Sequence, residues 1–346
     1  MSEAQVLRTF PHRHSGHCES GTISALLRDR GLALSEPMWF GIGSGLFFLH
    51  TARIKVGGLP LTTYRVAPLG IVRNASRRLG ITMRYERFRD PRRAKDRLDD
   101  LLARGESVGL QACVYWLPYF PADMRFQFNG HNLVAFAHDE SGFWLSDPVF
   151  EHIVCCPPDA LQRARFARGA FAPRGLLYFP ESVPAAPDIE GAIRQGIKST
   201  CRQMLDIPLL PVGVRGIRAL ARQMGQWPRQ LGEARARAQV TQIVRMQEEI
   251  GTGGAGFRFI FAAFLREATT YVEGPLLEDL SKEMTAIGDQ WRQWAVTGAQ
   301  VCRGQRAGAD VYHELAALLR SLAAREEALF RALWDGVIRR RRRGVA

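Results

Sequence analysis

Several features are scarce or missing in this chain of 346 residues. No apolar run reaches the roughly 18 residues that a membrane-spanning helix needs, so we expect no membrane span. The first residues, MSEAQVLRTF, are not followed by an apolar segment of secretory length, so we expect no signal peptide and a cytoplasmic location. There is no C-x-x-C pair, no P-loop and no dinucleotide-binding glycine pattern, and we expect no cofactor.

The six cysteines lack the dense, even spacing of a secreted disulfide framework, which indicates reduced thiols. Vicinal Cys155 and Cys156 are poorly placed to bind one tetrahedral metal ion, and His12, His14 and His17 beside Cys18 match no structural zinc spacing. We therefore expect no metal site. The cysteines are Cys18, Cys113, Cys155, Cys156, Cys201 and Cys302.

Acidic residues are also in deficit, and the formal net charge is +13. Such a charge favours an acidic partner, which could be nucleic acid, anionic lipid or an acidic protein. Lysine is rare beside arginine, so a biased genome explains part of the excess. No recognisable DNA-reading element is present, and we expect no nucleic acid partner.

The pattern of apolar residues changes near residues 180–188, a proline-rich stretch that is typical of a linker. Before it, the segments 107–119, 131–139, 142–149 and 174–180 have the pattern of strands, and 90–105 that of a helix ended by Gly105. After it, apolar residues recur at helical spacing. The sequence thus predicts an α+β domain over residues 1–182, an all-α domain over 188–338, and a solvated basic tail over 339–346.

Cys18 stands at the predicted start of a helix that ends before Gly31. Exposed N–H groups at a helix N-terminus stabilise a thiolate, and they can also stabilise the oxyanion formed when sulfur attacks a carbonyl. A buried structural cysteine is the alternative, and on Cys18 alone it is the more common case.

A predicted hairpin over residues 131–149 shifts the interpretation of Cys18 from a structural toward a reactive cysteine. With its turn at residues 140 and 141, His131 lies opposite residues close to 149, and Asp147 is its near neighbour. A carboxylate beside an imidazole orients the ring and stabilises its charged form, and such a histidine can activate a thiol. An ordinary pair of polar residues at a hairpin end is the alternative.

The order of an early helical cysteine, a strand histidine and a later aspartate resembles the papain-like fold. The segments 16–48, 130–150 and 248–268 resemble the family named for butirosin biosynthesis protein H, including the uncharacterised helical domain that follows its N-terminal domain. The resemblance implies a cysteine acyltransferase of specialised metabolism. It would move an acyl group from a carrier-protein or CoA thioester, through acyl-Cys18, to an amine or hydroxyl of a small molecule. Cys18 would be the nucleophile, His131 the base and Asp147 the residue that orients it.

Two alternatives remain open on the sequence alone. A cysteine peptidase or amidase would use the same three residues with water as the acceptor, whereas a non-catalytic basic binding protein would not need them to converge. The glutamine that completes a papain-like oxyanion hole is missing from residues 12–17, so the backbone N–H of Cys18 and one of the nearby side chains are the candidates. Glu36 could contact a cationic acceptor or cap a turn.

Overall fold

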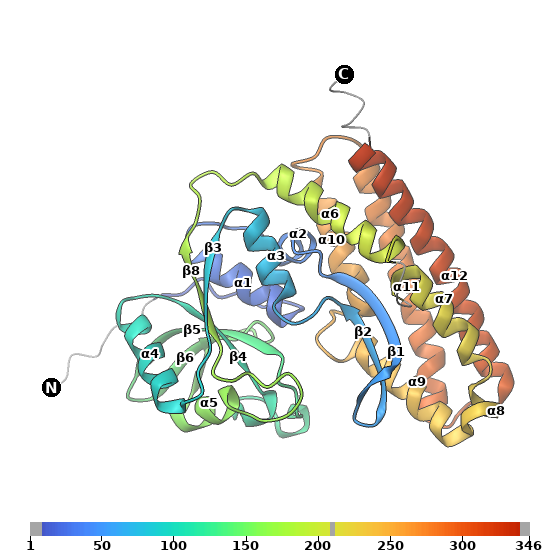
Figure 1. Cartoon of the computed structure of the whole chain (residues 1–346), viewed down its shortest axis with the longest axis horizontal. Helices are drawn as coiled ribbons and strands as arrows, with labels where there is room; N and C mark the ends of the chain where they lie inside the picture. The colour runs from blue at the N-terminus through green and yellow to red at the C-terminus, as the bar shows by residue number, and fades with distance from the viewer. Residues whose placement is uncertain (1–8, 208–211, 340–346) are drawn as a thin grey trace. The chain divides into compact units, whose positions relative to one another are not determined.

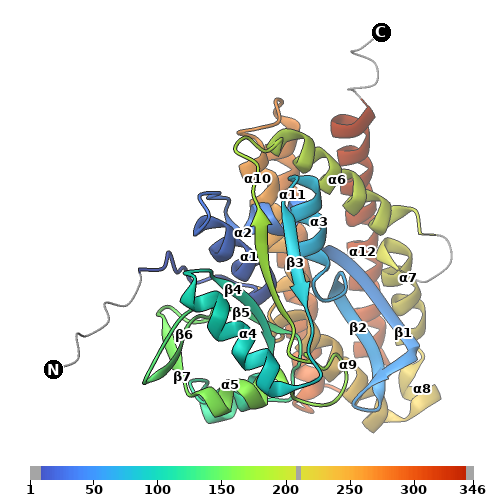
Figure 2. The ribbon, with the colours of Figure 1, turned by 60° about the vertical axis from the view of Figure 1, so that its left-hand side comes forward.

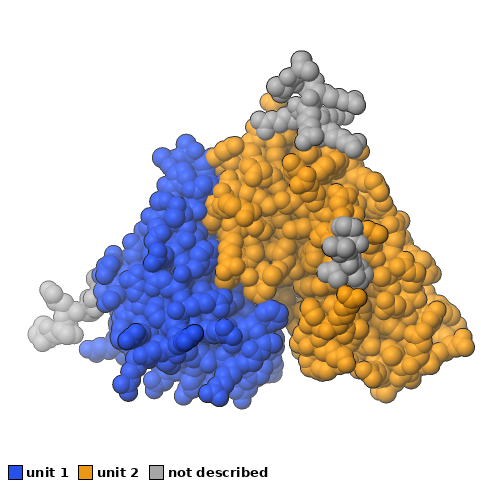
Figure 3. Space-filling view, in the orientation of Figure 1, with its two compact units in different colours: residues 1–39, 79–187 blue, residues 40–78, 188–346 orange. Residues whose placement is uncertain are grey.

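The computed structural model describes residues 9–207 and 212–339. The predicted basic tail, residues 339–346, lies outside the described residues except for its first residue. The contacts divide the chain into two compact units (Figure 3). Unit 1 comprises residues 1–39 and 79–187, and unit 2 comprises residues 40–78 and 188–346.

Unit 1 is built around a six-stranded sheet in which every neighbouring pair of strands is antiparallel. The strand order is β3-β8-β4-β5-β6-β7 (Figure 1). The strands are β3 (Thr82–Glu86), β4 (Val108–Ala112), β5 (His131–Asp139), β6 (Gly142–Ser146), β7 (Val154–Cys156) and β8 (Leu177–Ser182).

Helices cover this sheet because its strands carry apolar side chains on both faces. Alternate residues of the central strands, such as Leu110 and Leu133, join one buried cluster with α4 (Pro91–Ala103) and α5 (Pro158–Arg165). Figure 2 shows both helices beside the sheet. The helix α1 (Cys18–Arg28) contacts β4 and β5. Nearly all of α1 is buried, so the start of this helix is fixed by packing along its length.

Local sequence signals explain the elements that were predicted correctly. Asp90 caps α4 through a hydrogen bond from the Arg92 N–H at 2.9 Å, and Gly105 adopts a φ of +76° just after the helix ends. The hairpin β5–β6 turns between Asp139 and Gly142 as predicted, with a register shift between Ala135 and Ala137, and β6 ends at Ser146 rather than at the predicted residue 149. The predicted helix over 90–105 and this hairpin are therefore both confirmed.

The predicted strand over residues 107–119 is shorter in the structure, and β4 ends at Ala112. The next N–H groups leave the sheet: that of Cys113 donates to Ala164 O, and that of Val114 donates to Phe128 O. A short 3₁₀ turn, η1 (Val114–Trp116), follows. The apolar residues after Ala112 therefore do not continue the strand: Val114 and Leu117 are buried in the turn, and Tyr115 and Trp116 are exposed aromatic residues.

Unit 2 is mainly helical. A two-stranded hairpin and α3 precede the helices that follow the linker, and α2 (Glu36–Ile42) crosses from unit 1 into unit 2. The elements are β1 (Leu46–Val56), β2 (Leu59–Arg65), α3 (Gly70–Arg78), α6 (Ile189–Leu205), α7 (Gly213–Met224), α8 (Trp227–Leu231), α9 (Glu233–Glu248), η3 (Ala255–Phe257), α10 (Arg258–Ala268), α11 (Leu276–Cys302), α12 (Ala309–Leu333) and η4 (Trp334–Arg339). The predicted α+β fold class with a helical C-terminal region is confirmed.

The two units differ from the predicted division in one segment, because residues 40–78 group with the helices. The rings of Phe48 and Tyr64 pack against Trp291 of α11. The buried Arg258 lies over Tyr64 and Trp291 and forms a two-bond ion pair with Glu326. These contacts are remote in sequence, so composition alone does not reveal them.

Candidate active site

Cys18 is the first residue of α1 and is 5% exposed. His17 precedes it in an extended conformation and caps the helix, accepting a hydrogen bond from the Ser20 N–H. The first N–H groups of a helix have no partner within the helix, so they point at whatever lies beyond its N-terminus. The predicted position of Cys18 at a helix start is thus observed.

Glu36, at the start of α2, holds the turn that leads into Cys18. Its carboxylate accepts hydrogen bonds from the N–H groups of Gly16, at 2.9 Å, and His17, at 2.7 Å. The Ser20 hydroxyl donates a third bond at 3.2 Å. Burial raises the pKa of Glu36, although these hydrogen bonds and His14 act in the opposite direction. Of the two roles considered for Glu36, the structure shows a backbone cap.

His131 and Asp147 lie at one end of the β5–β6 hairpin and are both buried. The ring Nε2 of His131 is 2.7 Å from Oδ2 of Asp147. That same carboxylate oxygen accepts a bond from the Tyr119 hydroxyl at 2.8 Å, and Oδ1 accepts one from the Val149 N–H at 3.2 Å. A carboxylate with three donors is fixed in orientation, and it fixes the imidazole in turn.

Cys18 and His131 interact directly, and their contact completes a chain from Cys18 to Asp147. Because Nε2 faces Asp147, the ring nitrogen left for the sulfur is Nδ1. Burial lowers the pKa of His131, but the charge and hydrogen bond of Asp147 outweigh it, and Cys18 adds to the effect, so that the pKa rises to about 10. The three residues predicted from the sequence are therefore brought together, with the ring favouring its charged form near neutral pH.

The segment before Cys18 is tied to the segment around Asp147. The Ser15 N–H donates to Pro148 O at 2.7 Å, and His12 contacts Ser146 Oγ at 2.7 Å and Phe150 O at 3.2 Å. Gly21 permits this close approach, because a Cβ there would lie 2.6 Å from Ser15 Cβ and 2.7 Å from Pro148 Cβ. These contacts thus fix the start of helix α1 against the segment around Asp147.

The choice of oxyanion-hole donor is narrowed by these contacts. Both ring nitrogens of His12 have partners around Asp147, and Nδ1 of His17 contacts Ser20 at the start of α1. The backbone N–H of Cys18 remains a candidate beside the other side chains of residues 12–17, since it lies in the first turn of the helix.

Sequence reasoning missed two tyrosines of the site. Tyr119 was an aromatic residue of unspecified role, and its bond to Asp147 depends on a turn that no motif marks. Tyr178 is fully buried on β8, and its hydroxyl donates to Asn132 Oδ1 at 3.1 Å. Its pKa is raised well above the usual value by burial and by the nearby acids and thiol, Cys18 among them. No local signal could have identified either residue.

The glycine-rich link before α10 has a structural role. The Ala255 N–H in the glycine-rich link before α10 donates to the Glu248 carboxylate, and the Gly254 N–H donates to the Thr252 hydroxyl. Across the described ranges, no three His, Cys, Asp or Glu side chains gather closely enough to hold a metal ion. None of the helices described there combines the length and the apolar character needed to cross a membrane.

Comparisons with known proteins place this chain in a family. Residues 17–148 match the family model described as butirosin biosynthesis protein H, N-terminal, and residues 159–333 match a domain of unknown function, DUF4872. A solved structure described as a C39-like peptidase from Bacillus anthracis is 12% identical, with a TM-score of 0.32; the match covers 51% of this chain and 98% of that one. No curated protein matches. The family match and the Cys18–His131–Asp147 chain point to a cysteine enzyme.

Proposed function

Because this chain belongs to the family in which the butirosin biosynthesis protein H N-terminal domain is followed by a DUF4872 domain, we propose that it is a cysteine-dependent acyltransferase of a biosynthetic pathway. The observation that carries the proposal is the chain of contacts from Cys18 through His131 to Asp147 at the start of a buried helix. Each residue has a distinct role in the reaction.

In the first half-reaction, the charged His131 ring already holds the proton of the Cys18 thiol, and the sulfur attacks the carbonyl carbon of an acyl thioester. The N–H of Cys18 stabilises the oxyanion, and Asp147 stabilises the charged ring. When the tetrahedral intermediate collapses, the carbon–sulfur bond to the donor breaks. His131 returns the proton to the departing thiolate, which leaves acyl-Cys18 and a free donor thiol.

In the second half-reaction, an amine or hydroxyl of a small-molecule acceptor attacks the acyl-Cys18 carbonyl. His131 removes the acceptor's proton and passes it to the Cys18 sulfur as the carbon–sulfur bond breaks. The products are an amide or ester and the regenerated thiol. The donor is a carrier-protein thioester or a CoA thioester, and the scheme needs no cofactor.

A hydrolase would build the same acyl-Cys18 intermediate and discharge it to water. The burial of Cys18, which is 5% exposed, supports the transferase because it restricts the access of water to the intermediate. The family's place in biosynthesis supports the same choice.

The test is a time course of the acyl adduct by intact-protein mass spectrometry, with and without candidate amines and alcohols. We expect an adduct that persists in buffer and is discharged when a suitable acceptor is added. Rapid loss to the free acid in buffer alone, unchanged by every acceptor, would favour the hydrolase.

A further inference from the structure

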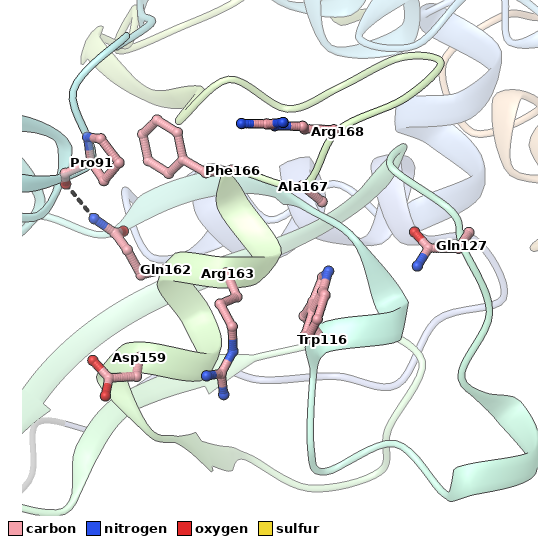
Figure 4. Close-up of a pocket in the computed structure, with 9 residues that line it drawn as sticks. All are labelled: Pro91, Trp116, Gln127, Asp159, Gln162, Arg163, Phe166, Ala167 and Arg168. Atoms are coloured by element: carbon pink, nitrogen blue, oxygen red, sulfur yellow. Dashed lines mark hydrogen bonds between the residues drawn. The ribbon is translucent and has the colours of Figure 1, made fainter.

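Unit 1 carries a cavity of ≈ 680 Å³ beside α5 that the proposed chemistry does not use (Figure 4). The side chains of Trp116, Gln127, Arg163 and Arg168 line it, and the Arg163 guanidinium lies over the Trp116 ring at 5.6 Å. An adjoining hollow of ≈ 400 Å³ shares Arg168. Phe166 and Ala167 also line both hollows, and we call the two together the α5 groove.

The α5 groove is basic. The adjoining hollow adds Arg89 and Arg174 to the two arginines of the main cavity, and Asp159 is the acidic side chain that lines it. All of these arginines are exposed, and within the described part of the chain neither Arg163 nor Arg168 forms an ion pair. Unpaired guanidinium groups in a concave surface favour an anionic partner.

Exposed apolar residues lie next to the lining residues of the α5 groove along the chain. Trp116 lines it directly, and Tyr115 is its neighbour in η1; they are 38% and 45% exposed. Met124 and Phe126 precede Gln127, and Phe171 follows Arg168 by three residues. Aromatic residues, methionine and arginine are the types enriched at protein–protein interfaces. We call Trp116 and these exposed neighbours in the sequence the apolar rim. Apolar residues beside a basic groove suit a protein surface better than a small anion, so they favour an acidic protein as the occupant.

The α5 groove is close to the active site along the chain. Gln127 is four residues before His131, so their Cα atoms are at most about 14 Å apart. The Cys113 thiol contacts Gln127 Oε1 at 3.5 Å, and its neighbour Ala112 pairs with His131 in the sheet. The Asn129 side chain donates to Arg168 O at 3.1 Å. A partner seated there could deliver a flexible arm to Cys18.

We propose that the α5 groove and its apolar rim dock the acidic carrier protein that presents the acyl thioester. The inference rests on the proposed acyltransferase function and names the surface that recognises the donor. Arg163 and Arg168 contact acidic side chains of the carrier, and the exposed rings cover the apolar part of its surface. The carrier is held by its protein surface, while the reacting thioester reaches Cys18 on its arm.

The test compares three butanoyl donors: a purified acidic acyl carrier protein, CoA and N-acetylcysteamine. The variant is Arg163→Glu/Arg168→Glu. The matched control is Arg222→Glu/Arg229→Glu, two exposed arginines in unit 2 whose reversal changes the net charge equally. The readout is the rate of acylation of Cys18 by mass spectrometry at low and high salt.

We expect the α5 groove variant to slow acylation by the carrier about tenfold or more at low salt, with less effect at high salt, because the contact is electrostatic. Acylation by N-acetylcysteamine and CoA thioesters stays unchanged, and the control variant behaves as wild type. Equal loss with all three donors, or loss with CoA as well as carrier, would overturn protein docking. An unchanged rate with every donor would also overturn the docking surface, whereas acylation of the wild type would still identify Cys18 as the nucleophile. If no donor acylates wild-type Cys18, the acyltransferase itself is wrong and the docking surface falls with it.

Discussion

Replacing Glu36 with glutamine tests how the turn before the nucleophile is held. In the wild type, one carboxylate oxygen accepts from Gly16 and the other accepts from His17 and Ser20. Glutamine keeps a single oxygen and must point its NH₂ group, a donor, at one of these donors. The Glu36→Gln variant therefore loses at least one charge-assisted hydrogen bond and places two donors together.

The expected loss of stability is modest. A hydrogen bond to a charged group contributes about 1.5–3 kcal/mol. Burial raises the pKa of Glu36, which means that the buried negative charge is itself unfavourable, and its removal offsets part of the loss. We expect the free energy of unfolding to fall by about 1–2 kcal/mol at neutral pH.

The effect on the reactivity of Cys18 should be of similar size, because the turn held by Glu36 includes the cap of α1. We expect iodoacetamide to label Cys18 about tenfold more slowly, which corresponds to about 1.4 kcal/mol. Urea unfolding and mass-resolved labelling measure the two effects. The matched control is Glu151→Gln, an exposed glutamate, which should change the unfolding free energy by less than about 0.5 kcal/mol.

Two results would refute this role of Glu36. One is that Glu36→Gln is labelled at the wild-type rate and unfolds at the wild-type urea concentration. The other is that Glu151→Gln has the same effect as Glu36→Gln. Either result would mean that the Glu36 carboxylate does not position the start of α1.

Three further predictions concern the same site. Iodoacetamide should modify Cys18 before Cys156, whose pKa burial raises to about 12, and before Cys201, whose pKa burial raises further; preferential labelling of the latter two would contradict the site. Burial opposes the charge on His131, but Asp147 and Cys18 outweigh it and raise the pKa of His131 from 6.5 to about 10. The charged ring therefore stabilises the folded state fully below about pH 6.5, and this stabilisation is lost as the pH rises toward 10. The wild-type unfolding free energy should therefore fall by about 1–2 kcal/mol between about pH 7 and 8.5, and His131→Gln should flatten this slope in urea titrations. Gly21→Ala should destabilise the protein by about 1–3 kcal/mol and slow the labelling of Cys18, since the added Cβ meets two side chains at less than 3 Å; unchanged unfolding would show that the contact relaxes freely.

The parts of the site that lie on regular local patterns could be predicted from the sequence. An apolar face and the glycine stop at Gly31 identify the helix of Cys18, and the alternation and turn of β5–β6 bring His131 and Asp147 to one end of the hairpin. The family was also predicted correctly from these segments. Each of these signals spans only a few neighbouring residues.

The remaining features depend on contacts between distant segments. Glu36 reaches the turn before Cys18 across about 20 residues of chain, and Tyr119 reaches Asp147 through a turn without a sequence signature. The grouping of β1 and β2 with the helices depends on Tyr64 meeting Trp291. The local pattern and spacing of residues do not reveal which distant residues come into contact, so these features could be seen only in the structure.

The most direct test of the proposed mechanism is to locate the acyl group itself. The protein is incubated with an acyl thioester, digested without reduction, and mapped by tandem mass spectrometry, alongside Cys18→Ser and His131→Gln. We expect one acyl group on Cys18 in the wild type, none in Cys18→Ser, and much slower formation in His131→Gln. An acyl group on another cysteine, or equal acylation of wild type and Cys18→Ser, would contradict the mechanism.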